Sequence, residues 1–246
     1  TTNNQHFFSE LGQRIVKIAS RLGPYGKLYE VDLRLRPTGR SGALATTFGE
    51  FARYFAEGQG QLWERQALTK ARVAIASPAT AHAAELLVYN ACYDHAWHSS
   101  LAATIREMRW RMEENAPPNN IKRGPGGIVD IEFLVQLWQL KYGRDDPQLR
   151  LPNTLAALEA LDKAGHVNRA DFEYMTESYL FLRSIEARLR LMNCVSRVLP
   201  GDPIELAKLA HALGYADGRE LETECRSYLR RNRERFDAIL AAEASS

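Results

Sequence analysis

The sequence lacks the features that mark several classes of protein. Its 246 residues include only three cysteines, Cys92, Cys194 and Cys225, which lie far apart. Such a set, in a chain of this length, predicts reduced thiols rather than a disulfide framework, and therefore a cytoplasmic protein. No apolar run approaches the length of a membrane span, and the N-terminus has no signal-peptide pattern. We therefore expect no membrane association.

The chain also lacks an excess of charge of either sign. It has 32 basic and 30 acidic residues, for a net charge of +2. That balance gives no overall attraction toward nucleic acid or an anionic membrane, so we expect neither as a partner. The 45% of hydrophobic residues is ordinary for a globular protein and is enough to build a sizeable core.

Two regions of different character follow one another along the chain. Residues 1–76 combine helical patterns with two short alternating segments, over 28–36 and 43–47, which predict strands. Residues 77–246 are expected to be almost entirely helical. Two strands alone do not make a stable sheet, which suggests that the chain is a fragment of a larger protein.

Apolar spacing and turn residues set the expected helices. They cover residues 8–22, 48–56, 63–72, 79–90, 101–114, 128–142, 154–164, 172–192, 203–213 and 217–240. Residues 241–246 are expected to be a frayed tail.

The first segment with chemical potential is LYEVDLRLRPTGRSG, residues 28–42. On a strand its alternation places Asp32, Arg34 and Arg36 on one face, opposite the apolar residues. One carboxylate beside two bidentate phosphate binders suits a metal–nucleotide site. The alternative is a solvated strand face with cross-strand ion pairs, which on pattern alone is the more common case.

The second segment is NIKRGPGGIVDIEF, residues 120–133. Lys122 and Arg123 precede a glycine-rich turn that leads directly into a helix. Glycines let backbone amides approach an anion, and a helix N-terminus adds favourable partial charge, so Gly124, Gly126 and Gly127 are candidates for a phosphate cradle. The segment is not a P-loop, because its lysine precedes the glycines. The alternative is a plain glycine-rich helix entry.

Two acids follow this turn, Asp130 and Glu132. The pattern around them is helical, and residues two apart on a helix point in different directions. We therefore reject a metal pair made of these two acids. We expect at most one of them to face a nucleotide cleft.

Several charged residues, Arg183, Glu186, Arg188 and Arg190, lie on the long helix expected over 172–192. Their spacing is typical of ion pairs along one helix, and we interpret them in that way.

Four segments in order, LYEVDLRLRPTGRSG, WERQALTKAR, IKRGPGGIVDIEF and YLFLRSIEARLRLM, resemble the glutamine synthetase adenylyltransferase family. The resemblance extends over nearly the whole chain. It implies a mainly α protein: a remnant of a polymerase-β-type nucleotidyltransferase α/β domain over 1–76, followed by a helical-bundle domain over 77–246. Enzymes of this family contain two similar halves, one adding AMP to glutamine synthetase and one removing it. The amino-acid sequences of these segments resemble the adenylylating half more closely, and the adenylyl-removing half is the alternative.

By this resemblance, Asp32 matches the third catalytic carboxylate of the superfamily and would bind Mg²⁺, with Arg34 and Arg36 beside it. The Gly-Ser motif and the Asp-x-Asp pair that supply the other carboxylates are absent here. The resemblance places ATP as substrate and glutamine synthetase as partner. Lys122, Arg123 and the three glycines would close the nucleotide cleft, and Asp130 or Glu132 would orient the incoming tyrosine hydroxyl or the base of the nucleotide. We expect the isolated chain to be inactive. A different class of function is a non-catalytic docking module for glutamine synthetase or a PII-type signal protein.

Overall fold

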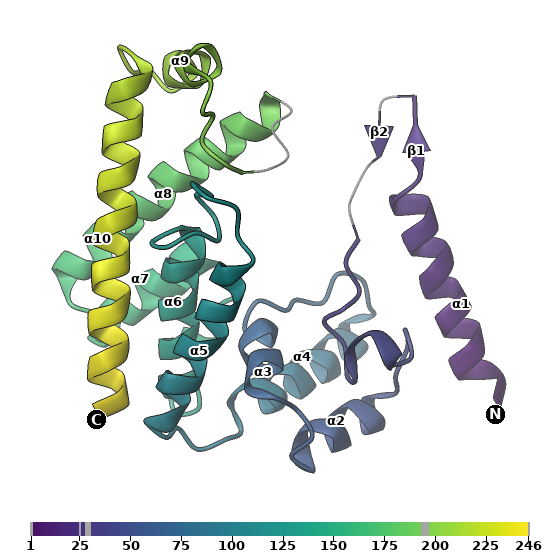
Figure 1. Ribbon diagram of the computed structural model, residues 1–246. Helices are drawn as coiled ribbons and strands as arrows, with labels where there is room; N and C mark the ends of the chain where they lie inside the picture. Colours follow the sequence, from purple (N-terminus) through teal and green to yellow (C-terminus); the bar gives the residue numbers. More distant parts are fainter. Residues whose placement is uncertain (1, 25, 28–30, 193–196, 246) are drawn as a thin grey trace. The chain divides into compact units, whose positions relative to one another are not determined.

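The computed structural model describes residues 2–24, 26–27, 31–192 and 197–245, which are mainly helical (Figure 1). The chain forms two compact units, Thr1–Asp94 and His95–Ser246. The division comes later than the boundary that we predicted after residue 76, because the helix α4, Pro78–Tyr93, packs against two helices of the first unit.

The first unit begins with α1, Thr2–Ala19, and a small hairpin. The hairpin pairs β1, Leu22–Gly23, with β2, Gly26–Lys27, in antiparallel register. Three further helices follow: α2, Phe48–Ala56; α3, Leu62–Leu68; and α4, with a 3-10 turn at Gly39–Ser41 before them.

Local caps explain where two of these helices start. Thr47 accepts a hydrogen bond from the amide of Glu50, whose carboxylate accepts from the amide of Thr47, so α2 begins with a capping box. Ser77 caps α4 and Pro78 occupies its first turn.

The predicted strands are not formed in the described residues. Residues 31–36 and 43–47 have no regular secondary structure, while 28–30 lie outside the described residues. A strand needs a neighbour for its backbone groups. Here the polar groups are used locally instead: the amide of Arg36 donates to the carbonyl of Arg34, and the amide of Arg34 donates to Asp32.

The helix α1 carries an uncovered apolar face. Its exposed apolar side chains are spaced at three and four residues, the spacing that forms one stripe along a helix. They are Phe7, Leu11, Ile15 and Ile18, continued by Leu22 of the hairpin, and each is at least 41% exposed. Contiguous exposed apolar surface of this kind is typical of an interaction surface.

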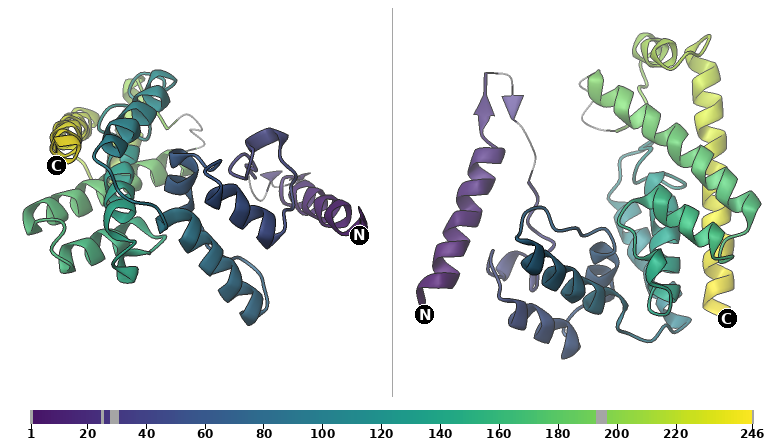
Figure 2. Two further views of the ribbon diagram at one scale, coloured as in Figure 1. Left: turned by 90° about the horizontal axis from the view of Figure 1, so that it is seen from below. Right: turned by 180° about the vertical axis from the view of Figure 1, so that it is seen from behind.

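The second unit is a bundle of six helices and one 3-10 turn among the described residues. Its helices are α5, Ser100–Glu114; α6, Ile128–Tyr142; α7, Thr154–Lys163; α8, Arg169–Leu191; α9, Pro203–Ala212; and α10, Gly218–Ser245. The turn is Pro147–Leu149. The long α10 packs against α5, α6, α8 and α9, and the right-hand view of Figure 2 shows it running along the height of this unit.

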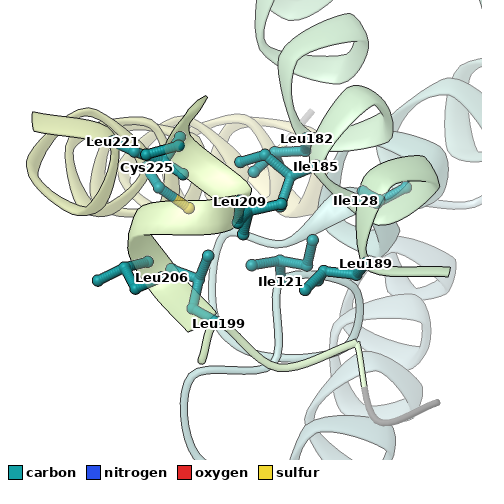
Figure 3. Close-up of a cluster of buried hydrophobic side chains, with 11 residues drawn as sticks. Ile121, Ile128, Leu182, Ile185, Leu189, Leu199, Leu206, Leu209, Leu221 and Cys225 are labelled. Carbon is teal, nitrogen blue, oxygen red and sulfur yellow. The ribbon is translucent and has the colours of Figure 1, made fainter. Parts of the chain in front are cut away.

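One core cluster joins the upper helices of this bundle (Figure 3). It brings side chains from α8, α9, α10 and the segment before α9 onto Ile121, which precedes α6, and Ile128, the first residue of α6. Its buried members are Ile121, Ile128, Leu182, Ile185, Leu189, Leu199, Leu206, Leu209, Ala210, Leu221 and Cys225. Cys225 and Cys92 are both buried free thiols, and Cys194 lies outside the described residues.

The chain end does not fray as we predicted, because α10 continues to Ser245. Glu243 accepts hydrogen bonds from Lys141 Nζ at 2.6 Å and from Trp138 Nε1 at 3.2 Å, both on α6. These contacts hold the last turns of α10 against α6. No helix in the described part of the chain is both long enough and apolar enough to cross a membrane.

Two leucines that lie two residues apart on α8, and therefore on different faces of the helix, test this packing. Leu182 is fully buried, whereas Leu180 is 52% exposed. We expect Leu182→Ala to lower the free energy of unfolding by about 2–5 kcal/mol, because it leaves a cavity in the core. Leu180→Ala should change it by less than about 1 kcal/mol. Urea unfolding followed by circular dichroism measures both, and equal effects would contradict this core.

Candidate functional site

The Asp32 carboxylate is exposed and is held by Arg34. The amide of Arg34 donates to Asp32 Oδ1 at 3.0 Å, and its Nε lies 2.9 Å from both carboxylate oxygens. Both side chains are more than half exposed. The hydrogen bonds and charge of Asp32 raise the pKa of Arg34 above its usual value. Arg34 therefore fixes the direction of an accessible carboxylate.

Arg36 stabilises the RPTGRSG loop, residues 36–42, because its guanidinium donates hydrogen bonds to backbone carbonyls. Its Nε donates to the carbonyl of Gly42 at 3.0 Å, and its Nη1 donates to the carbonyl of Leu33. Gly42 lies close to the backbone of Pro37: an added Cβ would come within 2.1 Å of the Pro37 carbonyl oxygen. The RPTGRSG loop is thus held tightly from within.

This loop forms one wall of a cavity of about 270 Å³ inside the first unit. Leu35, Arg36 and Pro37 line one side of it, and apolar residues of α2 and α3 line much of the rest. Glu64 and Lys70 are its further charged residues. An apolar cavity with a few charged groups has the character of a small-molecule pocket.

The glycine-rich turn of the second unit does not offer its amides to a ligand. Each backbone N–H from Lys122 to Val129 already donates within the segment, Pro125 having none. For example, Gly127 donates to Gly124, and Ile128 donates to Ile121. The turn is therefore a self-satisfied helix entry, which is the alternative reading of the sequence.

Its glycines are required by close packing. Gly126 has a φ of +71°, and a Cβ there would come within 1.6 Å of the Leu229 carbonyl oxygen on α10. The Gly126 carbonyl accepts from Asn232 Nδ2 at 2.8 Å, and Asn232 Oδ1 in turn accepts from Ser178 on α8. The turn is thus wedged directly against α10.

Asp130 lies at the centre of this packing and is fully buried. Its Oδ1 accepts from Arg109 Nε of α5 at 2.5 Å, and its Oδ2 accepts from the amide of Gly126 at 2.8 Å. Arg233 Nε of α10 lies 3.5 Å from Oδ2. Arg109 also donates to the carbonyl of Gly124 at 2.7 Å. One carboxylate therefore joins α5, α6, α10 and the turn.

Burial raises the pKa of Asp130 to about 6, although Arg109 and the amide of Gly126 both favour the ionised form. Removal from water costs the carboxylate more than its partners return.

The remaining predicted residues of this segment face different ways. Arg123 is exposed, and Lys122 Nζ lies 3.5 Å from the buried Glu186. Glu132 accepts from Tyr179 Oη on α8 at 3.2 Å, whereas Asp130 faces α5 and α10. The expectation that the two acids diverge is confirmed. Of the predicted loop residues, Gly124, Gly126, Gly127 and Asp130 are buried.

Arg109, Arg233 and Asn232, which hold Asp130 and the turn, were not among the predicted site residues. Arg109 carried a readable signal, because it follows Ala102 and Ile105 at helical spacing, on the face that is buried in α5. A basic residue on an apolar face predicts a buried partner. Asn232 and Arg233 lie in a run of charged residues and carry no such signal.

Two family models match the two units separately. The family model for glutamate-ammonia ligase adenylyltransferase matches residues 1–86. The family model for GlnD PII-uridylyltransferase matches residues 99–241, more than half of the chain. Two proteins of Stenotrophomonas maltophilia, from strains K279a and R551-3, are each 36% identical over 243 residues. Both carry the name bifunctional glutamine synthetase adenylyltransferase/adenylyl-removing enzyme.

The chain belongs to the glutamine synthetase adenylyltransferase family. The alignments with the two Stenotrophomonas proteins cover 96% of this chain and 26% of each relative. The resemblance inferred from the four sequence segments is confirmed. The roles of Asp32, Arg34 and Arg36 in that family's chemistry stay predictions.

Two glycines with the same backbone conformation test the wedge against α10. Gly165 has a φ of +76° and open space around it, whereas Gly126 faces the backbone of α10. We expect Gly165→Ala to cost about 1–2 kcal/mol, the penalty for a left-handed residue. Gly126→Ala should cost about 3–5 kcal/mol, because the clash adds to it. Urea unfolding compares the two, and equal costs would contradict the wedge.

The raised pKa of Asp130 predicts a pH dependence of stability. The folded chain binds this proton more tightly, with a pKa of about 6 against the ordinary 3.8, so the contribution of Asp130 to the free energy of unfolding falls as pH rises from about 4 to 6. The fall is at most about 3 kcal/mol. Asp130→Asn should lack it. Unfolding midpoints at pH 4.5 and 7 give the slope for each protein, and identical slopes would refute the assignment.

Proposed function

We propose that the chain is part of an enzyme that transfers AMP from ATP to a tyrosine of glutamine synthetase. The observation that carries the proposal is the Asp32 carboxylate, which is exposed and held in one direction by Arg34. It lies in the segment that resembles the third catalytic carboxylate of the superfamily.

The residues present could supply part of a Mg²⁺ site, but they do not form a complete one. Mg²⁺ is usually bound by one or two carboxylates together with substrate phosphates and water. Asp32 supplies one such carboxylate, and the described residues contain no group of three acids, histidines or cysteines that would hold a metal. When bound, Mg²⁺ would neutralise charge on the triphosphate. In this proposal the other carboxylates come from outside this sequence.

In this proposal the residues of the first unit bind and orient. Arg34 keeps the Asp32 carboxylate in a fixed direction, and Arg36 keeps the following loop closed. This loop lines one side of the cavity described above, and the apolar walls of that cavity suit a nucleotide base. In the reaction, a bond forms between the tyrosine oxygen and the α-phosphorus of ATP, and the bond to pyrophosphate breaks while the phenol loses its proton.

In the second unit, Lys122 and Arg123 are the predicted ligand residues whose side chains reach solvent. Any nucleotide contact from this segment is therefore made by these side chains and by Glu132, while the three glycines and Asp130 support the packing beneath them. This assignment refines the cleft predicted from the sequence.

The uncovered apolar stripe of α1 supports a catalytic domain that is completed by other residues. Phe7, Leu11, Ile15 and Ile18 lie on a helix that, among the described residues, has no extensive packing partner. A nucleotidyltransferase sheet bearing the missing carboxylates is the segment that would cover it. The same stripe is compatible with the adenylyl-removing half. The proposal that this chain adds AMP rather than removes it therefore rests on the amino-acid sequences of the motif segments.

A second candidate is a docking role for the helical unit, favoured by the match of residues 99–241 to the PII-uridylyltransferase model. A unit that occurs with both adenylyl and uridylyl transfer is not itself what selects the nucleotide. It is then a common element that binds glutamine synthetase or a PII-type signal protein. Pull-down with each partner, using Asp32→Asn to separate binding from catalysis, tests this role.

The experiment for the catalytic proposal uses the full-length enzyme that contains this sequence. We expect Asp32→Asn to lower AMP transfer to glutamine synthetase by at least about 100-fold, because a carboxylate that binds the metal is lost. Transfer of label from ATP measures it. The control is Glu57→Gln, an exposed acid after α2 in the same unit, which should leave the rate unchanged. The 246-residue chain alone should transfer no AMP. Full activity of Asp32→Asn, or any transfer by the chain alone, would contradict the proposal.

A further inference from the structure

Four basic side chains converge on one buried carboxylate at the end of α8. Glu186 is only 2% exposed, and its Oε1 lies 3.5 Å from Lys122 Nζ, 3.2 Å from Arg190 Nη2 and 3.0 Å from Arg197 Nε. Its Oε2 contacts Arg183 Nη1. We call these five residues the Glu186 cluster.

Ion pairing along one helix explains only half of this cluster. Arg183 and Arg190 lie three and four residues from Glu186, as the sequence predicted. Lys122 and Arg197 come from other segments, one before α6 and one before α9. The amide of Ile121 donates to the carbonyl of Arg197 at 3.1 Å, so the two segments are joined beside the cluster.

The backbone of Arg197 is strained to reach this place. Its φ is +51°, in the left-handed region that costs a non-glycine residue of order 1–2 kcal/mol. Its Nε is buried and lies near Glu186 without good hydrogen-bond geometry. Strain that is kept at a charged cluster, rather than relieved by glycine, is typical of functional positions.

The cluster has more positive charge than its carboxylate neutralises. Among the described residues, the ion pairs of all four cations end on Glu186. Three positive charges are therefore in excess. The cations also remain accessible: the side chains of Arg183, Arg190 and Arg197 are 42%, 54% and 36% exposed, and that of Lys122 is 26% exposed. Guanidinium groups held in place with unused N–H donors are the usual means of binding phosphate.

We propose that the Glu186 cluster binds a phosphate-bearing anion, with Glu186 gathering the four cations from beneath and the anion lying on their solvent side. Such a ligand would neutralise the excess charge and accept the remaining guanidinium N–H groups. Two sources share this chemistry, the phosphates of a nucleotide and free phosphate or pyrophosphate. The inference concerns the helical unit and does not depend on the transfer reaction proposed above.

The first test observes the arginines of the unaltered 246-residue chain. NMR signals of the arginine Nε–H groups are followed while pyrophosphate, inorganic phosphate, ATP or adenosine is added without Mg²⁺. We expect pyrophosphate and ATP to shift the signals of Arg183, Arg190 and Arg197, and adenosine to leave them in place. Equal affinities for pyrophosphate and ATP assign the site to phosphate groups as such, and tighter ATP binding assigns it to a nucleotide. No shift with about 10 mM of either polyphosphate, a level that detects millimolar binding, overturns the proposal.

The second test uses matched variants and calorimetric titration with pyrophosphate. Arg190→Gln should weaken the affinity about tenfold, and Arg190→Lys should weaken it less, because charge is kept while the guanidinium is lost. The control is Arg226→Gln, an exposed arginine of α10 that pairs with Glu222. It should bind within about twofold of the original chain. Equal losses in Arg190→Gln and Arg226→Gln would show diffuse surface binding and overturn the proposal. Circular dichroism confirms that each variant is folded, and if Arg190→Gln is not, the NMR titration decides.

Discussion

The buried contact between Arg109 and Asp130 is the constraint on which the helical unit depends. It places a carboxylate at the first turn of α6, ties that turn to α5, and draws the amide of Gly126 onto the same carboxylate. The turn can then lie directly against the backbone of α10, where only glycine fits. A buried pair of this kind costs desolvation energy and contributes little net stability, but removing one partner leaves an uncompensated charge. The main contribution of the Arg109–Asp130 pair is to specify that α5, α6 and α10 pack against one another.

The same contact changes the meaning of the sequence segment that contains it. Lys and Arg before a glycine-rich turn and a helix are a reasonable prediction of an anion site. The structure uses the amides of Gly124, Gly126 and Gly127 within the turn instead. The segment around Asp32 behaves in the opposite way, since its carboxylate stays exposed. Burial, which spacing alone does not reveal, separates a structural segment from a candidate catalytic one.

Helices were predictable from the sequence because their causes are local. The bounds of α2 and α6 match the expected residues 48–56 and 128–142, and Asn153, Asn168 and Asp202 cap α7, α8 and α9. The predicted strands depended on partners that are not local, so alternation at residues 31–36 did not produce one. The contacts of Asp130 with Arg109 and Arg233 join residues far apart in the chain, and only the position of Arg109 on an apolar face gave a sign of them.

Two buried carboxylates of the helical unit show how the number of cations decides the role of an acid. Burial raises the pKa of Asp130, because Arg109 and the Gly126 amide do not repay the lost hydration. Burial acts in the same direction on Glu186, but Lys122 and three arginines together outweigh it and lower the pKa of that acid. The partners of Asp130 are enough to hold neighbouring helices together, and among the described residues they leave no excess of positive charge comparable to that at Glu186. Glu186 is surrounded by more positive charge than it can neutralise. A local excess of positive charge produces a positive electrostatic potential, which attracts anions.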